Sequence, residues 1–253
     1  MNEAVVVRSL TKVFYDESRG EIPAVAGIDF ECRSGEIFGL LGANGAGKTT
    51  TLRMLSTVLQ PTSGTATVLG HDVVQDPVSV RRNLGFYSAS TALYPRLTAR
   101  ETIEFFARIN QYPRERIRER VSYLLERFGI VKFADARVEK LSTGMKQKVS
   151  IARTIAHDPP LLVFDEPTVG LDVLNALELQ DIIRELRAQG KTVLFSTHIM
   201  SEAEKLCDRI AIIHGGRILA CDTLDSLRQA TGQQYLQDIF VQYVRGPVRE
   251  AVG

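Results

Sequence analysis

The chain has 253 residues, of which 44% are hydrophobic and 24% charged, so it is long enough and apolar enough to bury a large core. Its 31 lysines and arginines nearly cancel its 30 aspartates and glutamates, leaving a formal net charge of +1. This balance argues against nucleic acid as the main partner, and the composition excludes a chain that is disordered throughout.

Cysteine usage and apolar runs bear on where the protein works. Cys32, Cys207 and Cys221 show no paired spacing, so we expect free thiols in a reducing cytosol. The first residues lack a basic stretch followed by an apolar one, and we expect no secretory signal. Because the apolar runs stop far short of the about 20 residues that cross a bilayer, we expect a cytoplasmic protein that serves a membrane only from outside.

Short apolar runs alternate with longer amphipathic segments along the chain, which predicts an α/β fold with a parallel sheet flanked by helices. In chain order, the predicted strands are residues 5–8, 22–32, 37–41, 65–69, 161–165, 192–196, 209–214 and 217–221. The predicted helices begin near Gly47, Thr98, Pro113, Thr143, Val173, Met200, Thr223 and Tyr235. The strand signal fades after about residue 86, so we expect a helical subdomain that interrupts the sheet.

A glycine-rich segment follows the predicted strand 37–41. It fits the phosphate-binding pattern Gly-x-x-x-x-Gly-Lys-Ser/Thr and opens a helix. Its glycines let backbone N–H groups converge on phosphate oxygens, the Lys48 ammonium adds charge near the β- and γ-phosphates, and the Thr49 hydroxyl can ligate Mg²⁺. We expect the nucleotide to be bound by Gly42, Asn44, Gly45, Ala46, Gly47, Lys48, Thr49 and Thr50.

A second apolar strand, residues 161–165, ends in two carboxylates, Asp165 and Glu166. The carboxyl end of a buried parallel strand is where such sheets expose their chemistry. We expect Asp165 to hold Mg²⁺, directly or through water, and Glu166 to polarise the attacking water. Alone, an apolar run before Asp-Glu is as often a helix cap, but together with the glycine-rich loop it predicts nucleotide hydrolysis.

The segment Leu141-Ser142-Thr143-Gly144-Met145 resembles the signature of ATP-binding-cassette (ABC) ATPases, usually Leu-Ser-Gly-Gly-Gln. Ser142 and Gly144 keep a hydroxyl and a bare backbone at a helix start, which can bind a γ-phosphate. Thr143 and Met145 depart from the family pattern. A helix N-cap explains Ser142 equally well, and both interpretations hold together.

Three further segments resemble motifs of the same family. Residues 167–172 are similar to the D-loop, which implies that Asp172 crosses between protomers. The strand that ends at His198 matches the switch histidine that senses the γ-phosphate. Near the N-terminus, Phe14 is in the place of the aromatic ring that stacks on adenine, with Tyr15 as the alternative, and either could equally be core.

One motif departs from the family. The family places a glutamine after a Leu-Gly-Phe-like strand, where it touches Mg²⁺ and relays the nucleotide state to the membrane partner. In this chain the corresponding residue is Ala89, which has no amide oxygen. Either Ser88 or Ser90 substitutes, a water fills the gap, or the coupling differs.

The resemblance covers about residues 3–225, and the stretches 39–55, 141–148 and 235–240 are similar to ATP-binding subunits of ABC-2-type exporters, especially the sodium-extruding NatA-like group. It implies a P-loop NTPase of the ABC type, with a RecA-like parallel-sheet core, an antiparallel β subdomain and an inserted helical subdomain at about 86–157. We expect one nucleotide-binding domain over residues 1–225 and a short helical extension over 226–253.

The resemblance also implies ATP and Mg²⁺ as ligands, Glu166, His198 and Lys48 as catalytic residues, and Thr49 and Asp165 on the metal. The signature would act across a head-to-tail dimer with a second copy or a paralogue. A separate membrane permease, contacted near residues 91–100 through an exposed Leu93 and Tyr94, would export sodium or a drug-like compound and hold the protein at the inner face of the membrane. The alternatives are a soluble non-transport ABC ATPase, a nucleotide kinase and a cassette that binds ATP without hydrolysing it.

Overall fold

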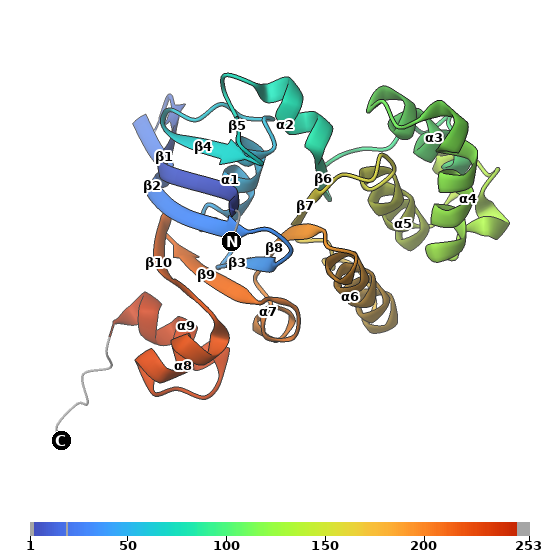
Figure 1. The fold of residues 1–253 in the computed structure, drawn as a ribbon. Coiled ribbons are helices and arrows are strands. Elements are labelled where there is room, and N and C mark those ends of the chain that lie inside the picture. The colour runs from blue at the N-terminus through green and yellow to red at the C-terminus, as the bar shows by residue number, and fades with distance from the viewer. Residues whose placement is uncertain (1–2, 19, 247–253) are drawn as a thin grey trace.

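The fold is built from two sheets and a group of helices that lies to one side of them (Figure 1). The computed structural model describes residues 3–18 and 20–246. Within these residues, the larger sheet has the strand order β10-β9-β3-β8-β7-β6. Its strands are β3 (Ile37–Leu41), β6 (Leu84–Ser88), β7 (Leu161–Asp165), β8 (Thr192–Thr197), β9 (Arg209–His214) and β10 (Arg217–Asp222).

The larger sheet is parallel from β6 to β9, and only β10 runs antiparallel to its neighbour. Every residue of β3, β7 and β8 is buried, as expected for central strands that are covered on both faces. This burial explains why these strands are short uninterrupted apolar runs in the sequence. Their carboxyl ends meet at one edge of the sheet, where the candidate site lies.

The smaller sheet is antiparallel, with the strand order β2-β1-β4-β5 in the described chain. Its strands are β1 (Glu3–Asp16), β2 (Gly20–Arg33), β4 (Ser63–Val68) and β5 (His71–Asp72). Helix α1 (Lys48–Leu55) shares one apolar cluster with both sheets through its buried Leu52 and Leu55. In the same cluster the rings of Phe30 and Phe38 stack at 5.2 Å. The helix that follows the glycine-rich loop is therefore fixed between the two sheets.

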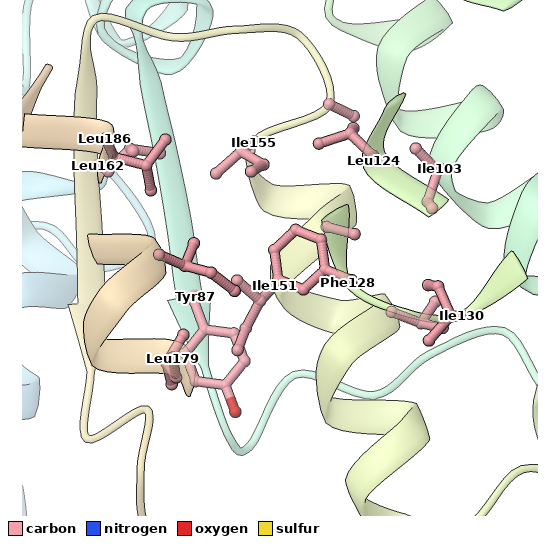
Figure 2. Close-up of a cluster of buried hydrophobic side chains, with 14 of the residues drawn as sticks. Tyr87, Ile103, Leu124, Phe128, Ile130, Ile151, Ile155, Leu162, Leu179 and Leu186 are labelled. Carbon is pink, nitrogen blue, oxygen red and sulfur yellow. The ribbon is translucent and has the colours of Figure 1, made fainter. Parts of the chain in front are cut away.

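The helical group consists of α3, α4 and α5 with short 3-10 turns between them (Figure 1). Their bounds are α3 (Ala99–Ile109), α4 (Ile117–Arg127), α5 (Thr143–Thr154) and the turns Arg114–Arg116, Val131–Phe133 and Val138–Lys140. Thr98 starts α3 with a capping box to Glu101, as its sequence pattern favours. Ile103, Leu124 and Phe128 fill the space between the helices, and the same cluster continues to the sheet through Leu162 (Figure 2).

The remaining helices are α2 (Pro77–Asn83), α6 (Val173–Ala188), α7 (Met200–Leu206), α8 (Leu224–Thr231) and α9 (Leu236–Arg245). Helices α8 and α9 pack through Leu227, Leu236 and Ile239 against the buried side of β9. They lie in the C-terminal part of the chain, where we expected a helical extension over residues 226–253, and residues 247–253 lie outside the described part. Within residues 3–18 and 20–246, no helix is both long and apolar enough to span a bilayer.

The α/β class and the parallel core are confirmed, and each predicted strand and helix has a counterpart, but three elements were missed, namely β5, α2 and β6. Residues 86–88, which we placed at the start of the helical subdomain, are the end of β6 in the parallel sheet. This strand holds only five residues and includes Gly85, so it carries little strand signal. A Cβ at Gly85 would lie 2.5 Å from the carbonyl oxygen of Thr154, which explains why a glycine stands there.

Candidate active site

The glycine-rich loop joins β3 to α1 and follows a path that only glycine allows at several points. Gly45 and Gly47 have φ angles of 80° and 110°, which side chains disfavour. A Cβ at Gly47 would lie 2.6 Å from the carbonyl oxygen of Ala24, and one at Gly42 would lie 2.4 Å from that of Ile213. The loop therefore has the turn and the close backbone approach that its sequence pattern predicted.

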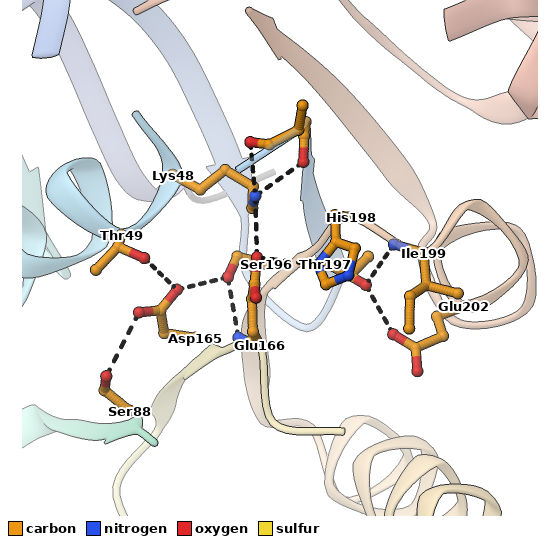
Figure 3. A network of polar contacts seen from close by, with 12 residues as sticks. Lys48, Thr49, Ser88, Asp165, Glu166, Ser196, Thr197, His198, Ile199 and Glu202 are labelled. Carbon is orange, nitrogen blue, oxygen red and sulfur yellow. Dashed lines mark hydrogen bonds and ion pairs between the residues drawn. The ribbon is translucent and has the colours of Figure 1, made fainter. Parts of the chain in front are cut away.

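The side chain of Lys48 folds back over this loop. Its Nζ donates hydrogen bonds to the carbonyl oxygens of Gly42 at 2.8 Å and Ala43 at 3.1 Å, and it pairs with Oε1 of Glu166 at 3.0 Å (Figure 3). The side chain is only 4% exposed. A buried ammonium is stable here because every partner is an oxygen, and one of them carries a full negative charge.

The carboxylate of Asp165 is surrounded by hydroxyl groups from three elements. Its Oδ1 accepts hydrogen bonds from Thr49 at 3.0 Å and Ser196 at 2.8 Å, and its Oδ2 accepts one from Ser88 at 3.5 Å (Figure 3). Carboxylate and hydroxyl oxygens are the hard ligands that Mg²⁺ prefers, usually one or two of them completed by phosphate and water. Thr49 and Asp165 thus fit a magnesium ion that arrives with a nucleotide.

In the described part of the chain, no group of three or more histidine, cysteine, aspartate and glutamate side chains could hold a metal ion. The protein therefore offers part of a coordination shell at Asp165 rather than a complete cage. Such a partial set is typical of sites where substrate phosphates supply the other ligands.

Glu166 has an unusual backbone conformation at the point where β7 ends. Its φ angle is 48°, in the left-handed region that side chains rarely adopt. The backbone N–H of Glu166 donates to the carbonyl oxygen of Ser196 at 3.2 Å and to its Oγ at 3.1 Å, which holds this conformation. Backbone strain of this kind is concentrated at functional sites, and here it accompanies a carboxylate that pairs with Lys48 and faces His198.

The pKa of Glu166 reflects these neighbours. Burial by itself raises the pKa of this carboxyl, but the hydrogen bond and charge of Lys48, with a smaller effect of His198, bring it below the usual value. The side chain is about a fifth exposed, at 22%. Glu166 is therefore ionised at neutral pH, as a base that activates water must be.

His198 follows β8 and faces Glu166 across the strand ends. Its Nδ1 lies 3.3 Å from Oε1 of Glu166, close enough for an ion pair but not aligned for a hydrogen bond (Figure 3). The turn that carries His198 is fixed by Thr197, whose Oγ1 donates to Oε2 of the buried Glu202 at 2.7 Å and accepts from the N–H of Ile199 at 3.0 Å.

The structure thus gathers five predicted residues at one edge of the sheet, namely Lys48, Thr49, Asp165, Glu166 and His198. It also adds residues that the sequence did not single out. Ser196 lies opposite Asp165 because β7 and β8 pair in that register, and Glu202 reaches Thr197 from α7. No local sequence pattern determines the register between parallel strands, so these contacts could not be identified from the sequence.

The signature segment lies elsewhere, at the start of α5 in the helical group (Figure 1). Ser142 is the N-cap of this helix, and its Oγ accepts a hydrogen bond from the N–H of Met145 at 3.3 Å. A Cβ added at Gly144 would meet nothing within 4 Å, so the backbone there is open. Leu141 is buried and anchors the segment, while Thr143 lines an open cavity together with Ser88.

Asp172 caps α6 through its carboxylate, which accepts a hydrogen bond from the N–H of Asn175 at 3.1 Å. Hydrogen bonds from the backbone and side chain of Asn175 lower the pKa of this exposed carboxyl. Phe14 and Tyr15 lie on β1 with 42% and 79% of their surface exposed, so the alternative that they belong to the core was wrong. The ammonium of Lys12 lies 5.3 Å from the centre of the Phe14 ring, which shows that the ring can take part in face contacts.

The sequence was compared with protein families and with known proteins. Residues 25–169 match the ABC transporter family. The chain is 39% identical to the ABC transporter ATP-binding protein NatA of Bacillus subtilis (strain 168) over 92% of its length and 95% of that protein. It is also 39% identical to the daunorubicin/doxorubicin resistance ATP-binding protein DrrA of Streptomyces peucetius, over 92% of this chain and 69% of DrrA.

Solved structures give the same result. The fold superposes on the ATP-binding subunit of an ABC transporter with a TM-score of 0.86 and 30% sequence identity, covering 95% of this chain and 99% of the other. It also superposes on a dimeric ATP-binding cassette in a post-hydrolysis state with ADP and Pi, with a TM-score of 0.79 and 27% identity, over 87% of this chain and 98% of that one.

Proposed function

Because this chain belongs to the ABC transporter family of ATP-binding proteins, whose chemistry is ATP hydrolysis, we propose that it is the ATP-hydrolysing subunit of an exporter whose membrane-spanning part is a separate chain. The observation that carries the proposal is the arrangement of Lys48 and Glu166 at 3.0 Å, above a glycine loop that can receive phosphates. No other described group of polar residues combines a phosphate-binding loop, a base and a carboxylate for a metal.

The geometry indicates how the residues would act on ATP. Phosphates that enter the loop compete with Glu166 and the loop carbonyls for the Lys48 ammonium. Once Lys48 turns to the phosphates, the carboxylate of Glu166 is released and can accept a proton from the attacking water. His198, beside the same carboxylate, is placed to orient that water or contact the terminal phosphate.

Magnesium would be held by Thr49 and Asp165, and it would supply positive charge that offsets the charge developing on the phosphate oxygens. The chain itself positions these two ligands. Ser196 and Thr49 fix Oδ1 of Asp165 within hydrogen-bond distance, at 2.8 Å and 3.0 Å, so little reorganisation is needed when a nucleotide binds.

We also propose that two copies, or one copy and a paralogue, enclose two ATP molecules head to tail. The open helix start at Ser142 and Gly144 supports this arrangement, because it lies in the helical group and away from α1 of its own chain (Figure 1). A helix N-terminus favours negative charge, and its free N–H groups can bind a phosphate presented by another chain. The dimeric cassette among the similar structures supports the same assembly.

Size-exclusion chromatography of the Glu166→Gln protein tests this function. With saturating ATP and Mg²⁺, the variant should bind but not cleave the nucleotide and should run as a dimer, whereas the same protein without nucleotide should run as a monomer. A Glu166→Gln protein that stays monomeric with bound ATP would contradict the dimer mechanism.

The permease contact is proposed near residues 91–100. Tyr94, Pro95, Leu97 and Phe105 line an open apolar cavity of about 540 Å³, with Tyr94 52% exposed. Leu93, which we expected to be exposed, is half-buried and packs against the main apolar cluster. Tyr94 is therefore the residue to test, and Tyr94→Ala should weaken complex assembly and transport while leaving ATP binding intact.

The proposed cargo is sodium or a drug-like compound, chosen by the permease. The drug-resistance proteins among the relatives support the second choice, and the resemblance to the NatA-like group supports the first. A soluble non-transport ABC ATPase is the alternative. Affinity purification of the tagged chain from solubilised membranes distinguishes the two, because an exporter subunit should bring down a chain with several membrane helices. Its location would then be the cytoplasmic face of the membrane.

A further inference from the structure

An open basic pocket lies where α3 ends and α4 begins, on the side of the helical group that faces away from the sheets (Figure 1). Its volume is about 320 Å³, and it is lined by Arg108, Gln111, Tyr112, Pro113 and Arg114. Two of these side chains are guanidinium groups and none is negatively charged. The pocket therefore favours an anion, although the proposed reaction makes no use of it.

The arginines around this pocket are only partly neutralised. Arg108 pairs with Glu104 one turn earlier on α3, and its side chain remains 65% exposed. Arg114 is exposed and forms no ion pair within residues 3–18 and 20–246. The guanidinium of Arg116 lies 5.9 Å from the centre of the Tyr112 ring, which itself lines the pocket. Contact with a ring orients a cation but leaves its charge, so Arg116 adds to the positive potential.

The turn before α4 and the start of this helix place like charges one helical turn apart. Arg114 and Arg118 are four positions apart, and so are Arg116 and Arg120. Like charges at this spacing destabilise a helix, and only Arg120 has a carboxylate beside it, that of Asp158 at 3.2 Å. A helix face that served solubility alone would have opposite charges at this spacing. An anion bound from outside would relieve the repulsion.

Exposed apolar side chains border the same region. Phe105 and Ile109 are one turn apart on α3, with 39% and 53% of their surface exposed, and Arg108 shares this face of the helix. Tyr94 packs edge-on against Phe105 with 5.8 Å between ring centres, and both line the cavity that we propose for the permease. The exposed face of α3 therefore continues from the proposed permease contact to the basic pocket.

We propose that Arg108, Ile109, Arg114 and Arg116 form a headgroup surface, which contacts anionic lipids of the membrane beside the permease. The proposal rests on the proposed function, because that function brings the chain to the cytoplasmic face of a membrane. The phosphate oxygens of the lipids would accept hydrogen bonds from Arg108 and Arg114, while Ile109 would enter the boundary between headgroups and acyl chains.

Nucleic acid fits the headgroup surface less well than a bilayer does. The phosphates of a nucleic acid are fixed along its backbone and need a continuous row of basic groups, whereas Glu104, Glu115 and Glu119 interrupt the row here. Separate lipids can move to the arginines and leave the glutamates without contact. An exposed isoleucine beside basic groups is also typical of helices that lie at a membrane interface.

Surface plasmon resonance with captured vesicles tests the proposal on the full chain in the absence of ATP. One kind of vesicle contains phosphatidylcholine alone, and the other contains equal parts of phosphatidylcholine and phosphatidylglycerol. Because several arginines each add to the attraction, the parent protein should bind the anionic vesicles about tenfold more tightly or better. Added salt should reduce this preference, since it screens exposed charges.

Substitutions distinguish the contributions to binding. Arg114→Gln should weaken binding to the anionic vesicles by about fivefold, whereas Arg114→Lys should keep most of it because the charge is retained. Ile109→Ser should weaken it by a similar factor, which contact with phosphate alone does not predict. The matched control is Arg245→Gln, because Arg245 on α9 is also exposed and without an ion pair in the described chain, but lies far from the helical group (Figure 1). This control should bind as the parent does.

Equal binding of the parent protein to both kinds of vesicle would overturn the inference, as would equal losses in Arg114→Gln and Arg245→Gln. Binding to an RNA oligonucleotide that is tighter than vesicle binding and depends on Arg114 would also overturn it, in favour of nucleic acid. None of these results affects ATP binding or capture of a permease, so the proposed function would stand. If the tagged chain captures no membrane protein, the proposed function fails, whatever the vesicles show.

Discussion

Polar groups are paired differently at the edge of the parallel sheet and in the helical group. At the sheet edge, Lys48, Asp165 and Glu166 satisfy one another and the nearby hydroxyls inside one chain. In the helical group, α3 to α5 bury mainly apolar side chains, and the helix start at Gly144 has nothing within 4 Å of an added Cβ. The reacting groups are thus paired within one chain, whereas the helix start at Gly144 is left open, as the proposed contact with a second chain requires.

The largest effect should come from the sheet edge. Glu166→Gln removes the proposed base while keeping the size of the side chain, so turnover of ATP should fall by about 10²–10⁴-fold with ATP binding retained. Steady-state phosphate release and equilibrium nucleotide binding measure the two quantities. Glu178→Gln is the control, because Glu178 on α6 pairs with Lys148 at 2.7 Å and should leave turnover unchanged. Equal losses in both variants would contradict the role of Glu166.

Lys48→Met should weaken ATP binding by about 10- to 100-fold, because hydrogen bonds to a charged group are worth about 1.5–3 kcal/mol. It also removes the cation that lowers the pKa of Glu166, so that pKa should rise. Calorimetry on ATP measures the affinity. Lys191→Met gives the matched control, since Lys191 is also mostly buried and pairs with Asp158 at 2.8 Å away from the site. Unchanged ATP affinity in Lys48→Met would refute the phosphate-binding role.

His157, which follows helix α5, is a half-buried ionisable group whose ring nitrogens are shielded from solvent. Burial lowers its pKa from 6.5 to about 4. Between these values the unfolded chain binds a proton that the folded chain does not, so stability falls as the pH falls. The loss reaches about 2 kcal/mol at pH 5.

His157→Leu should remove this loss. Urea unfolding at pH 7 and pH 5 measures it, and the drop in unfolding free energy between the two should be larger in the parent protein by about that amount. An equal drop in both proteins would show that His157 is not buried in its neutral form.

The smallest effect is expected at the N-caps of the helical group. Ser142→Ala removes the N-cap of α5 and Thr98→Ala that of α3, so each should lower the unfolding free energy by about 1 kcal/mol. Only Ser142→Ala should also weaken ATP-dependent dimerisation. Thermal unfolding checks the first expectation, and light scattering with ATP checks the second. Loss of the dimer in Thr98→Ala as well would mean that helix stability, and not contact with a partner, is responsible.

The sequence was informative wherever a local pattern determines the structure. The glycines at 45 and 47 predicted the loop because only they tolerate its φ angles, and the apolar run before Asp165 predicted a buried strand. Ser142 was predicted as a possible helix N-cap and a helix was predicted to begin near Val173, and the structure has both. The helical group was also recognisable, because its apolar residues recur with helical spacing.

Contacts between elements could not be predicted. Ser88 and Ser196 approach Asp165 only because β6 and β8 flank β7 in one register. Arg153 of α5 donates to the carbonyl oxygen of Ala92, in a loop 61 positions earlier in the chain. The sequence gives no sign of the left-handed backbone of Glu166, which is accompanied by a hydrogen bond from its N–H to Ser196 on the next strand. All of these contacts depend on strand order and register, which are set by the packing of the whole core.

We propose that a nucleotide held by Lys48 of one chain is closed by the helix start of another. The most direct test is the structure of the Glu166→Gln protein with ATP and Mg²⁺, in which the distance from Oγ of Ser142 to the terminal phosphate on the partner chain is measured. We predict hydrogen-bond distance, about 3 Å. A dimer in which this serine stays far from the partner's nucleotide in every ATP-loaded copy would contradict the proposed assembly.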